Sequence, residues 1–311
     1  MALSLTACGT SGASSNAAGS AAAGSAAAAQ SAASSAAQNQ TASTPSVTIS
    51  KETKKVKSDN KKVVLLNSEW NTAQVSIPGN ETAQKAIQAD LDQIMKSFAS
   101  TSKEYRKEAA GLYKDNSQSA DSSSYAAYYH SLTITKARCD SKIISLVFDE
   151  TSYTGGAHGT DNRYARNYDA TTGKVLTLKK LGTGVSKTAT DQILQFVNKI
   201  HKKDGLFFDS IKKTDLKDVV TDDMFYFDKD GLVFISGQYL LQSYAEGIVE
   251  FTISYDDLKG QLADTYSLGG GVTQCETGLG IYTLKSNGSL DTSKVDYSAL
   301  SGADGSASTD Q

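Results

Sequence analysis

Ile143-Ile144-Ser145-Leu146-Val147-Phe148 is the stretch that decides the fold of this chain. Five of its six side chains are apolar and three are β-branched, which is typical of a strand buried on both faces. The preceding residues 125–135 alternate apolar and polar side chains, as a strand with one buried face does. The two segments predict a sheet in which residues 143–148 are buried.

Two helices are predicted, one on each side of these strands in the sequence. The first begins after Pro78-Gly79, with Asn80 as its cap, and continues to about Tyr113. The second begins near Ser186. Apolar residues recur at helical spacing in both, namely Ile87, Leu91, Ile94 and Phe98 in the first and Ile193, Phe196, Val197 and Ile200 in the second.

Further apolar runs predict strands. Residues 63–66 and 73–77 are expected to pair as a hairpin around residues 67–72. A turn is expected at residues 170–174. The other expected strands are residues 163–168, 225–227, 232–236 and 248–255, with one short strand at 281–282.

The order of strands, helix, strands, helix, strands is typical of the α+β class with mainly antiparallel sheets. We expect two small α+β subdomains with one main helix each, at residues 51–135 and 136–264. Residues 1–8 are expected to be the remnant of a lipoprotein signal, residues 9–50 a disordered Ala/Ser/Gly tether, and residues 265–311 a mobile tail.

The N-terminus contains Leu5-Thr6-Ala7-Cys8, small residues before a cysteine as in a bacterial lipoprotein cleavage site. No charged residue occurs before Lys51. We expect Cys8 to be the lipid attachment residue, because two acyl chains on one cysteine give stable anchoring. Chance occurrence of the quartet is the alternative. No stretch approaches the ~18 consecutive apolar residues of a membrane span, so the expected location is the extracellular face of the bacterial cytoplasmic membrane.

Charge and cysteine content limit the partners. The net charge of −3 provides no overall basic face, so no nucleic-acid partner is expected. The lysine-rich residues 51–62 are either a contact for anionic envelope polymers and lipid headgroups or a solvated linker. Cys139 and Cys275 can form a disulfide in an extracellular location, and free thiols are the alternative.

A glycine-rich block, Ser152-Tyr153-Thr154-Gly155-Gly156-Ala157-His158-Gly159, follows the buried strand. Other short segments follow it in order: Tyr168-Asp169, Thr172-Gly173-Lys174, Asp230-Gly231-Leu232-Val233-Phe234, Tyr239, Tyr244-Ala245 and Gly247. This ordered set resembles the extracytoplasmic domain of RsiV-type anti-sigma factors, which sense lysozyme. It is also similar to the accessory region of some peptidoglycan deacetylases. The resemblance covers residues 61–262 and implies two α+β parts, the second carrying the Gly-Gly-Ala-His-Gly loop.

The resemblance does not extend to the effector parts of those families. The chain has no sigma-binding segment, no membrane span and no deacetylase domain, so we expect neither signalling through a sigma factor nor deacetylation.

The glycine-rich block has the chemistry of a binding loop. Its glycines permit positive φ and close backbone approach, His158 can exchange hydrogen bonds with a ligand, and Tyr153 can stack on one. The alternative is a tight bend with an internally packed histidine, and tyrosines that serve ordinary packing. The expected ligand-binding residues are Tyr153, Gly155, Gly156, His158, Gly159, Tyr239 and Tyr244.

Catalysis has little support in the sequence. Gly-x-Ser-x-Gly, His-x-x-x-His and Cys-x-x-Cys motifs are missing, so no catalytic serine, metal or cofactor is expected. A glycosidase needs two carboxylates, for which Asp149 and Glu150 are the best candidates. Because neighbours on a strand point to opposite faces, Asp161, Asp169 or Glu246 would have to complete the pair.

Two other segments imitate ligand-binding loops. Residues 182–188 resemble a phosphate loop, but Ser186 stands where a glycine should precede the lysine, so a loop and helix cap are expected. Residues 228–231 contain only the beginning of a calcium loop and are expected to form a hairpin turn.

The sequence therefore predicts a surface-anchored binding lipoprotein. The expected partner is peptidoglycan, another envelope glycan, or a glycan-cleaving enzyme such as lysozyme, and the membrane is contacted through the lipid on Cys8. A weak peptidoglycan or polysaccharide hydrolase or lyase is the alternative.

Overall fold

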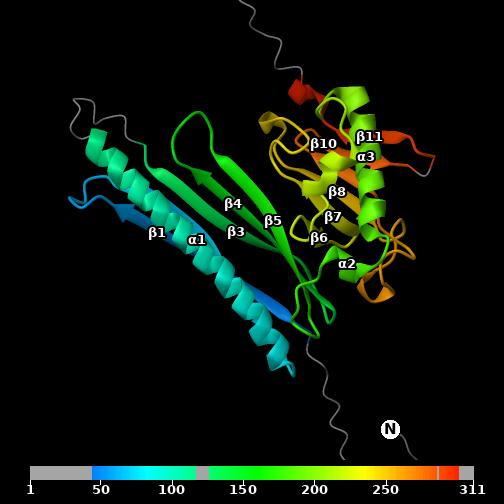
Figure 1. Ribbon diagram of the computed structural model, residues 1–311, viewed down its shortest axis with the longest axis horizontal. Coiled ribbons are helices and arrows are strands. Elements are labelled where there is room, and N and C mark those ends of the chain that lie inside the picture. Colours follow the sequence, from blue (N-terminus) through cyan, green and yellow to red (C-terminus); the bar gives the residue numbers. More distant parts are fainter. Residues whose placement is uncertain (1–43, 117–125, 286, 301–311) are drawn as a thin grey trace, which may run out of the picture. The chain divides into compact units, whose positions relative to one another are not determined.

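The computed structural model describes residues 44–116, 126–285 and 287–300, which form two antiparallel-rich sheets with one long helix each (Figure 1). This agrees with the predicted α+β class and with one main helix for each part. The predicted signal remnant with Cys8 and the predicted tether up to residue 43 lie outside the described residues. Among the described helices none is long and apolar enough to cross a membrane.

The first sheet has the strand order β1-β2-β3-β4-β5. Its neighbours pair antiparallel except β2 and β3, which are parallel and are joined through helix α1. Residues 143–148 are all buried within β4, as their composition predicts. The elements are β1 (Ser46–Lys57), β2 (Val64–Ser76), α1 (Glu81–Asn116), β3 (Tyr128–Cys139), β4 (Ile143–Tyr153) and β5 (Thr160–Asp169).

Helix α1 begins where the sequence predicts. The side chain of Asn80 accepts a hydrogen bond from the backbone N–H of Ala83 at 3.1 Å, which satisfies one of the free donors of the first turn. Ile87, Leu91 and Phe98 are at most 5% exposed and pack against apolar side chains of the sheet. Figure 1 shows the helix lying along the five-stranded sheet.

The second sheet has the order β11-β10-β9-β8-β7-β6, and all its neighbours are antiparallel. Helix α3 covers it with the predicted stripe, including Ile193 and Phe196, which are fully buried against Phe251 and Ile253. The elements are α2 (Leu178–Leu181), α3 (Val185–Asp204), β6 (Phe225–Phe227), β7 (Gly231–Ser236), β8 (Val249–Ser254), β9 (Gln274–Thr277), β10 (Gly280–Leu284) and β11 (Leu290–Val295). Short 3₁₀ helices are η2 (Lys213–Asp218), η3 (Tyr244–Glu246), η4 (Asp264–Tyr266) and η5 (Tyr297–Leu300).

Two polar side chains that are fully buried connect the sheets. The Ser145 hydroxyl donates to Asn167 Oδ1 at 2.7 Å and accepts from the backbone N–H of Phe227 at 3.0 Å. Asn167 Nδ2 donates to the backbone carbonyl of Phe225 at 2.7 Å. Strands β4 and β5 thereby satisfy the edge backbone of β6, which is required because buried backbone groups without partners are costly.

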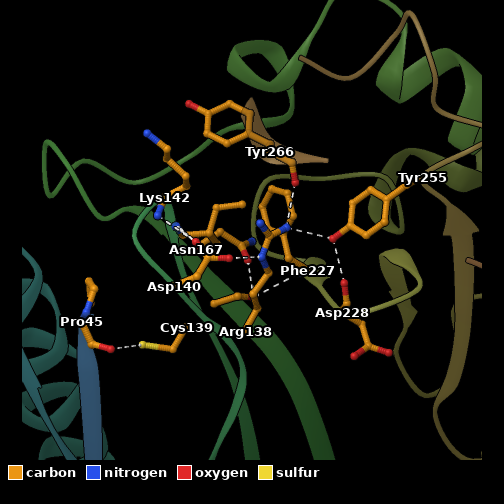
Figure 2. A network of polar contacts seen from close by, with 12 residues as sticks. Pro45, Arg138, Cys139, Asp140, Lys142, Asn167, Phe227, Asp228, Tyr255 and Tyr266 are labelled. Carbon is orange, nitrogen blue, oxygen red and sulfur yellow. Dashed lines mark hydrogen bonds and ion pairs between the residues drawn. The ribbon is translucent and has the colours of Figure 1, made fainter. Parts of the chain in front are cut away.

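Arg138, at the end of β3, makes a second connection (Figure 2). Its NH1 donates to the Tyr255 hydroxyl at 3.0 Å and to the Tyr266 carbonyl at 2.7 Å, and its guanidinium lies over the Phe227 ring. Its Nε donates to Asp140 at 2.6 Å. Burial acts to raise the pKa of Asp140, but backbone N–H donors and Arg138 outweigh it and hold that pKa below its usual range.

Several sequence expectations are wrong. The predicted hairpin at residues 63–77 is one continuous strand, β2, which pairs with β1 across residues 46–57. Residues 46–50 therefore belong to a strand and not to the tether, and most of the lysine-rich segment is strand rather than linker. The predicted boundary between residues 135 and 136 falls inside β3, because the first sheet extends to Asp169.

The predicted mobile tail is also wrong for residues 274–295, which form β9, β10 and β11. The short strand expected at 281–282 lies within β10. Residues 182–188 form the loop and start of α3, and residues 228–231 form the β6–β7 turn, as expected. Cys139 and Cys275 are free thiols, so the alternative to the disulfide holds.

Gly173 tests the packing between the 170–174 turn and the first turns of α1. It has a φ of +70°, and an added Cβ would lie 2.6 Å from the Ala83 carbonyl oxygen and 2.9 Å from Ala86 Cβ. Gly79 is the matched control, because its φ is +79° and its Cβ would meet nothing within 4 Å. Gly79→Ala should cost ~1–2 kcal/mol for the left-handed backbone alone.

Gly173→Ala should lose a further ~1–3 kcal/mol through the steric overlap. Chemical unfolding of the full chain measures both variants. Equal loss of stability in the two would contradict the close packing of this turn against α1.

Candidate functional site

The β4–β5 loop and the last residue of β4 carry five of the predicted binding residues. Gly155 and Gly156 have φ of +101° and +94°, where other residues are strained. Gly159 has ordinary φ, but its Cβ would lie 2.7 Å from the Ser152 carbonyl oxygen, so glycine is needed there for space. The Tyr153 hydroxyl donates to the Gly156 carbonyl at 3.0 Å. The loop is therefore both a tight bend and a closely defined surface.

The β7–β8 loop carries the remaining two, Tyr239 and Tyr244. Gln242, fully buried, organises this loop: its Nε2 donates to the carbonyls of Ser236, Gly237 and Gly247, the last at 2.8 Å. Its Oε1 accepts from the Ser236 hydroxyl at 3.0 Å. One amide thus draws both ends of the loop together and fixes where the two tyrosines lie.

The structure brings the two loops together. The rings of His158 and Tyr244 stack with centroids 4.0 Å apart, and the Tyr244 hydroxyl donates to the Gly159 carbonyl at 3.2 Å. Tyr239 lies next to Tyr244, at 5.7 Å between ring centroids. We call His158, Tyr239 and Tyr244 the tyrosine–histidine cluster. Residues about 80 positions apart in sequence form one surface.

Asp161 and Gln238 hold the bases of the two loops in register. The backbone N–H of Asp161 donates to Gln238 Oε1 at 3.1 Å, and Gln238 Nε2 donates to Asp161 Oδ2 at 3.3 Å. The other carboxylate oxygen of Asp161 accepts from the Thr151 hydroxyl at 2.7 Å. Because these contacts link β5 to the β7–β8 loop, they support the stacking of His158 on Tyr244.

An ion-pair network lies further along β5. Arg163 bonds Asp149 at 2.6 Å and Glu250 of β8 at 3.1 Å, and the Tyr226 hydroxyl donates to Glu250 at 3.1 Å. Burial raises the pKa of Glu250, and Arg163 opposes that rise. Burial and the neighbouring Glu250 charge raise the pKa of Tyr226 above its usual range. The network joins the two sheets.

Most of the carboxylates that a hydrolase would need have other roles. Asp149 pairs with Arg163, whereas Glu150 pairs with His130, so the two neighbours point to opposite faces, as predicted. Asp169 accepts hydrogen bonds from the backbone of the 170–174 turn. Burial raises the pKa of Glu246, which lies in η3. The larger grooves in the described part of the chain lie along α1, away from the tyrosine–histidine cluster.

Metal binding finds no support in the geometry. Across residues 44–116, 126–285 and 287–300 no group of three His, Cys, Asp or Glu side chains could hold an ion. Cys275 is buried, which raises the pKa of its thiol well above the usual value and makes a thiolate ligand unfavourable.

A network of polar contacts that the sequence did not reveal links the first sheet to α1. His130, fully buried, bonds Glu150 through Nε2 at 2.8 Å and the Ser102 hydroxyl through Nδ1 at 2.7 Å. Because a carboxylate only accepts, Nε2 of the ring carries a proton and donates to Glu150. The rings of Phe98 and Tyr105 enclose the imidazole. These hydrogen bonds attach the middle of α1 to β3 and β4.

Two family models match parts of the chain. Residues 65–161 match the model described as Deacetylase PdaC, and residues 183–256 match DUF3298, a family of unknown function. The chain carries a PdaC region and a DUF3298 region. His158 lies in the first and both tyrosines of the cluster lie in the second, so the tyrosine–histidine cluster is formed where the two regions meet.

A solved structure supports the fold. A DUF3298-family member from Bacteroides fragilis is 19% identical with a TM-score of 0.55, covering 71% of this chain and 94% of that one. A DUF3298-family protein from Pseudomonas aeruginosa is 16% identical with a TM-score of 0.42, covering 72% of this chain and 96% of that one. The first likeness supports the fold alone. No curated protein matches the chain.

Replacing Arg163 with methionine should destabilise the protein in a pH-dependent way. The loss in the free energy of unfolding should lie between the ~1 kcal/mol of a surface ion pair and the ~3–5 kcal/mol of a buried pair. The reason is that Glu250 keeps its buried charge without a cation. A carboxyl group with a raised folded-state pKa binds more protons in the folded state, so its contribution to stability falls as pH rises. Removing Arg163 raises the pKa of Glu250 further.

The deficit relative to wild type should therefore be largest near pH ~7 and shrink toward pH ~5. Denaturant unfolding at the two pH values measures it. Arg166→Met is the control on the same strand, since Arg166 lies over the Tyr164 ring and forms a partly exposed pair with Asp90 at 3.8 Å. A pH-independent deficit for Arg163→Met would refute the role assigned to Glu250.

Proposed function

We propose that this protein is a surface-anchored binding lipoprotein whose tyrosine–histidine cluster recognises a component of the cell envelope, either a glycan or a glycan-cleaving enzyme such as lysozyme. The observation that carries the proposal is the stacking of His158 on Tyr244 next to an exposed Tyr239. Tyrosine offers a broad apolar face and a hydroxyl, which suits it to both kinds of partner.

Tyr239 has the features of a contact residue. It is 57% exposed and has a φ of +63°, a conformation that costs a bulky side chain energy. Backbone strain of this kind persists only where the surroundings hold it, and it concentrates at functional sites. The buried Gln242 amide supplies that support, so Tyr239 is presented to solvent in a fixed position.

The shape of the surface favours a protein partner over a small sugar. Small ligands usually occupy concave pockets, whereas the larger grooves of the described residues lie elsewhere. Rigid tyrosines on paired loops are typical of protein interfaces. A glycan-cleaving enzyme is therefore the first partner to test, and a glycan is the second.

The two family regions support the coarser part of the proposal, an extracellular domain associated with the cell envelope. The resemblance of the glycine-rich block to lysozyme-sensing domains supports the finer part. Among the carboxylates considered for a hydrolase, Asp149, Glu150 and Asp161 are held by other side chains, which disfavours that alternative.

Binding of the purified full chain to lysozyme and to peptidoglycan fragments, followed by calorimetry, tests the proposal. Tyr239→Ala and His158→Ala should each weaken binding by ~1–3 kcal/mol, because they remove exposed contact area at the centre of the surface. Tyr297→Ala is the control, since Tyr297 is also exposed but lies in η5, outside the β4–β5 and β7–β8 loops. Folding is checked by the unfolding transition.

Failure of the folded wild-type chain to bind any of these partners would refute the proposal. If binding occurs and Tyr239→Ala and His158→Ala bind as well as Tyr297→Ala, another surface is responsible.

We also propose that Cys8 carries the lipid that anchors the protein to the membrane. Its support is the Leu5-Thr6-Ala7-Cys8 sequence. Protein isolated from the source membrane should give an N-terminal peptide beginning at Cys8 with a mass increase of two or three acyl chains. An unmodified Cys8 in that peptide would refute the anchor while leaving the binding proposal intact.

A further inference from the structure

A groove of about 460 Å³ lies between α1 and strands β1 and β2. Its strand side comes from alternate residues of β2, which share one face of the sheet, and its helix side from positions three and four apart on α1. We call it the α1 groove. Its lining residues are Lys54, Val56, Leu66, Ser68, Trp70, Thr72, Met95, Phe98, Ala99, Ser102, Lys103 and Arg106.

The groove exists because short side chains face one another. Ala99 and Ser102 on the helix lie opposite Ser68 on β2, so the two elements leave space between them. Larger residues close the core on both sides: one buried cluster includes Leu91 and Phe98, and another includes Ala109 with Leu66. The walls of the groove are therefore fixed by packed core residues.

Ser68 provides an independent observation that points to a ligand. The residue is 5% exposed, and its hydroxyl finds no hydrogen-bond partner among the described residues. A buried hydroxyl without a hydrogen-bond partner is destabilising. The Ser102 hydroxyl, by contrast, is bonded to His130. A ligand with an acceptor atom beside Ser68 would satisfy the unpaired donor.

The charge of the groove is one-sided. Lys54, Lys103 and Arg106 line it, and no carboxylate does. Lys54 pairs in register with Ser68 across the β1–β2 ladder. None of the three cations forms an ion pair within the described part of the chain. Three uncompensated cations beside an apolar floor match an anion that carries an apolar body.

We propose that the α1 groove binds an amphipathic anion: an aliphatic chain ending in a single carboxylate. The chain lies on Trp70, Met95 and Phe98, and the carboxylate lies toward Lys103 and Arg106. The helix side of the groove spans positions 95–106, which is roughly 16 Å at the helical rise per residue. The volume lies within the ~300–1,000 Å³ range of small-ligand sites.

Trp70 makes the proposal directly testable, because it is the one tryptophan of the chain and it lines the groove. Dodecanoate titrated into the purified full chain, below the concentration at which it aggregates, should produce a saturable change in tryptophan emission. Calorimetry on the same samples should give the same dissociation constant. Dodecyltrimethylammonium, with the same chain and a cationic head, should bind at least several-fold more weakly.

Variants of the groove give the second test. Lys103→Glu should weaken dodecanoate binding roughly threefold to tenfold, whereas Lys202→Glu, an exposed lysine on α3 with the same change of charge, should not. Ala99→Leu should fill the groove and abolish saturable binding. Position 99 is exposed and leucine is a good helix former, so its unfolding transition should match that of wild type.

Four outcomes would overturn the proposal: no saturable response by emission or calorimetry, equal binding of the cationic amphiphile, unchanged binding in folded Ala99→Leu, or equal weakening by Lys103→Glu and Lys202→Glu. Tryptophan emission that depends on protein concentration without dodecanoate would also overturn it, because a second copy of the chain would then occupy the groove. None of these depends on the tyrosine–histidine cluster.

Discussion

The rest of the structure depends on the hydrogen bonds that the backbone of β6 makes to the first sheet. This strand is the edge of the six-stranded sheet, and its buried N–H and C=O groups find their partners in Ser145 and Asn167 of the first sheet. Both side chains are fully buried, so an error in register would leave polar groups unpaired in the core. The junction sets where β5 lies relative to β7 and β8, and it therefore sets where His158 meets Tyr244.

The elements that sequence reasoning predicts well are those with strong periodic patterns. Residues 143–148 and most of the two apolar stripes are buried as expected, with Ile94 of α1 only partly buried, because a stripe at helical spacing faces the sheet. Strand β1 is not predicted from the sequence, because apolar and polar residues do not alternate over residues 50–57. Pairing with β2 keeps this segment extended. Residues 67–72 look like a loop because five of the six are polar, yet Asn71 is held in the sheet by accepting a hydrogen bond from the backbone of Ile134.

The two candidate sites differ in how much the sequence reveals of them. The glycines and tyrosines of the binding loops are visible as unusual residue types, although their stacking depends on contacts between distant segments that no local pattern encodes. The α1 groove is invisible in the sequence, because Ala99, Ser102 and Ser68 are common residues at ordinary positions. Only their facing positions, set by the β1–β2 register and by the packing of α1, leave the space open.

The lysines of β1 have a further consequence for the protein in a crowded envelope. As an outer strand of its sheet, β1 exposes a row of backbone groups that could pair with another chain. Lys51, Lys54, Lys55 and Lys57 are all exposed along it. An incoming strand would bring these charges into close contact with its own side chains. The same lysines that make the segment look like a linker thus protect a twelve-residue edge from strand-to-strand aggregation.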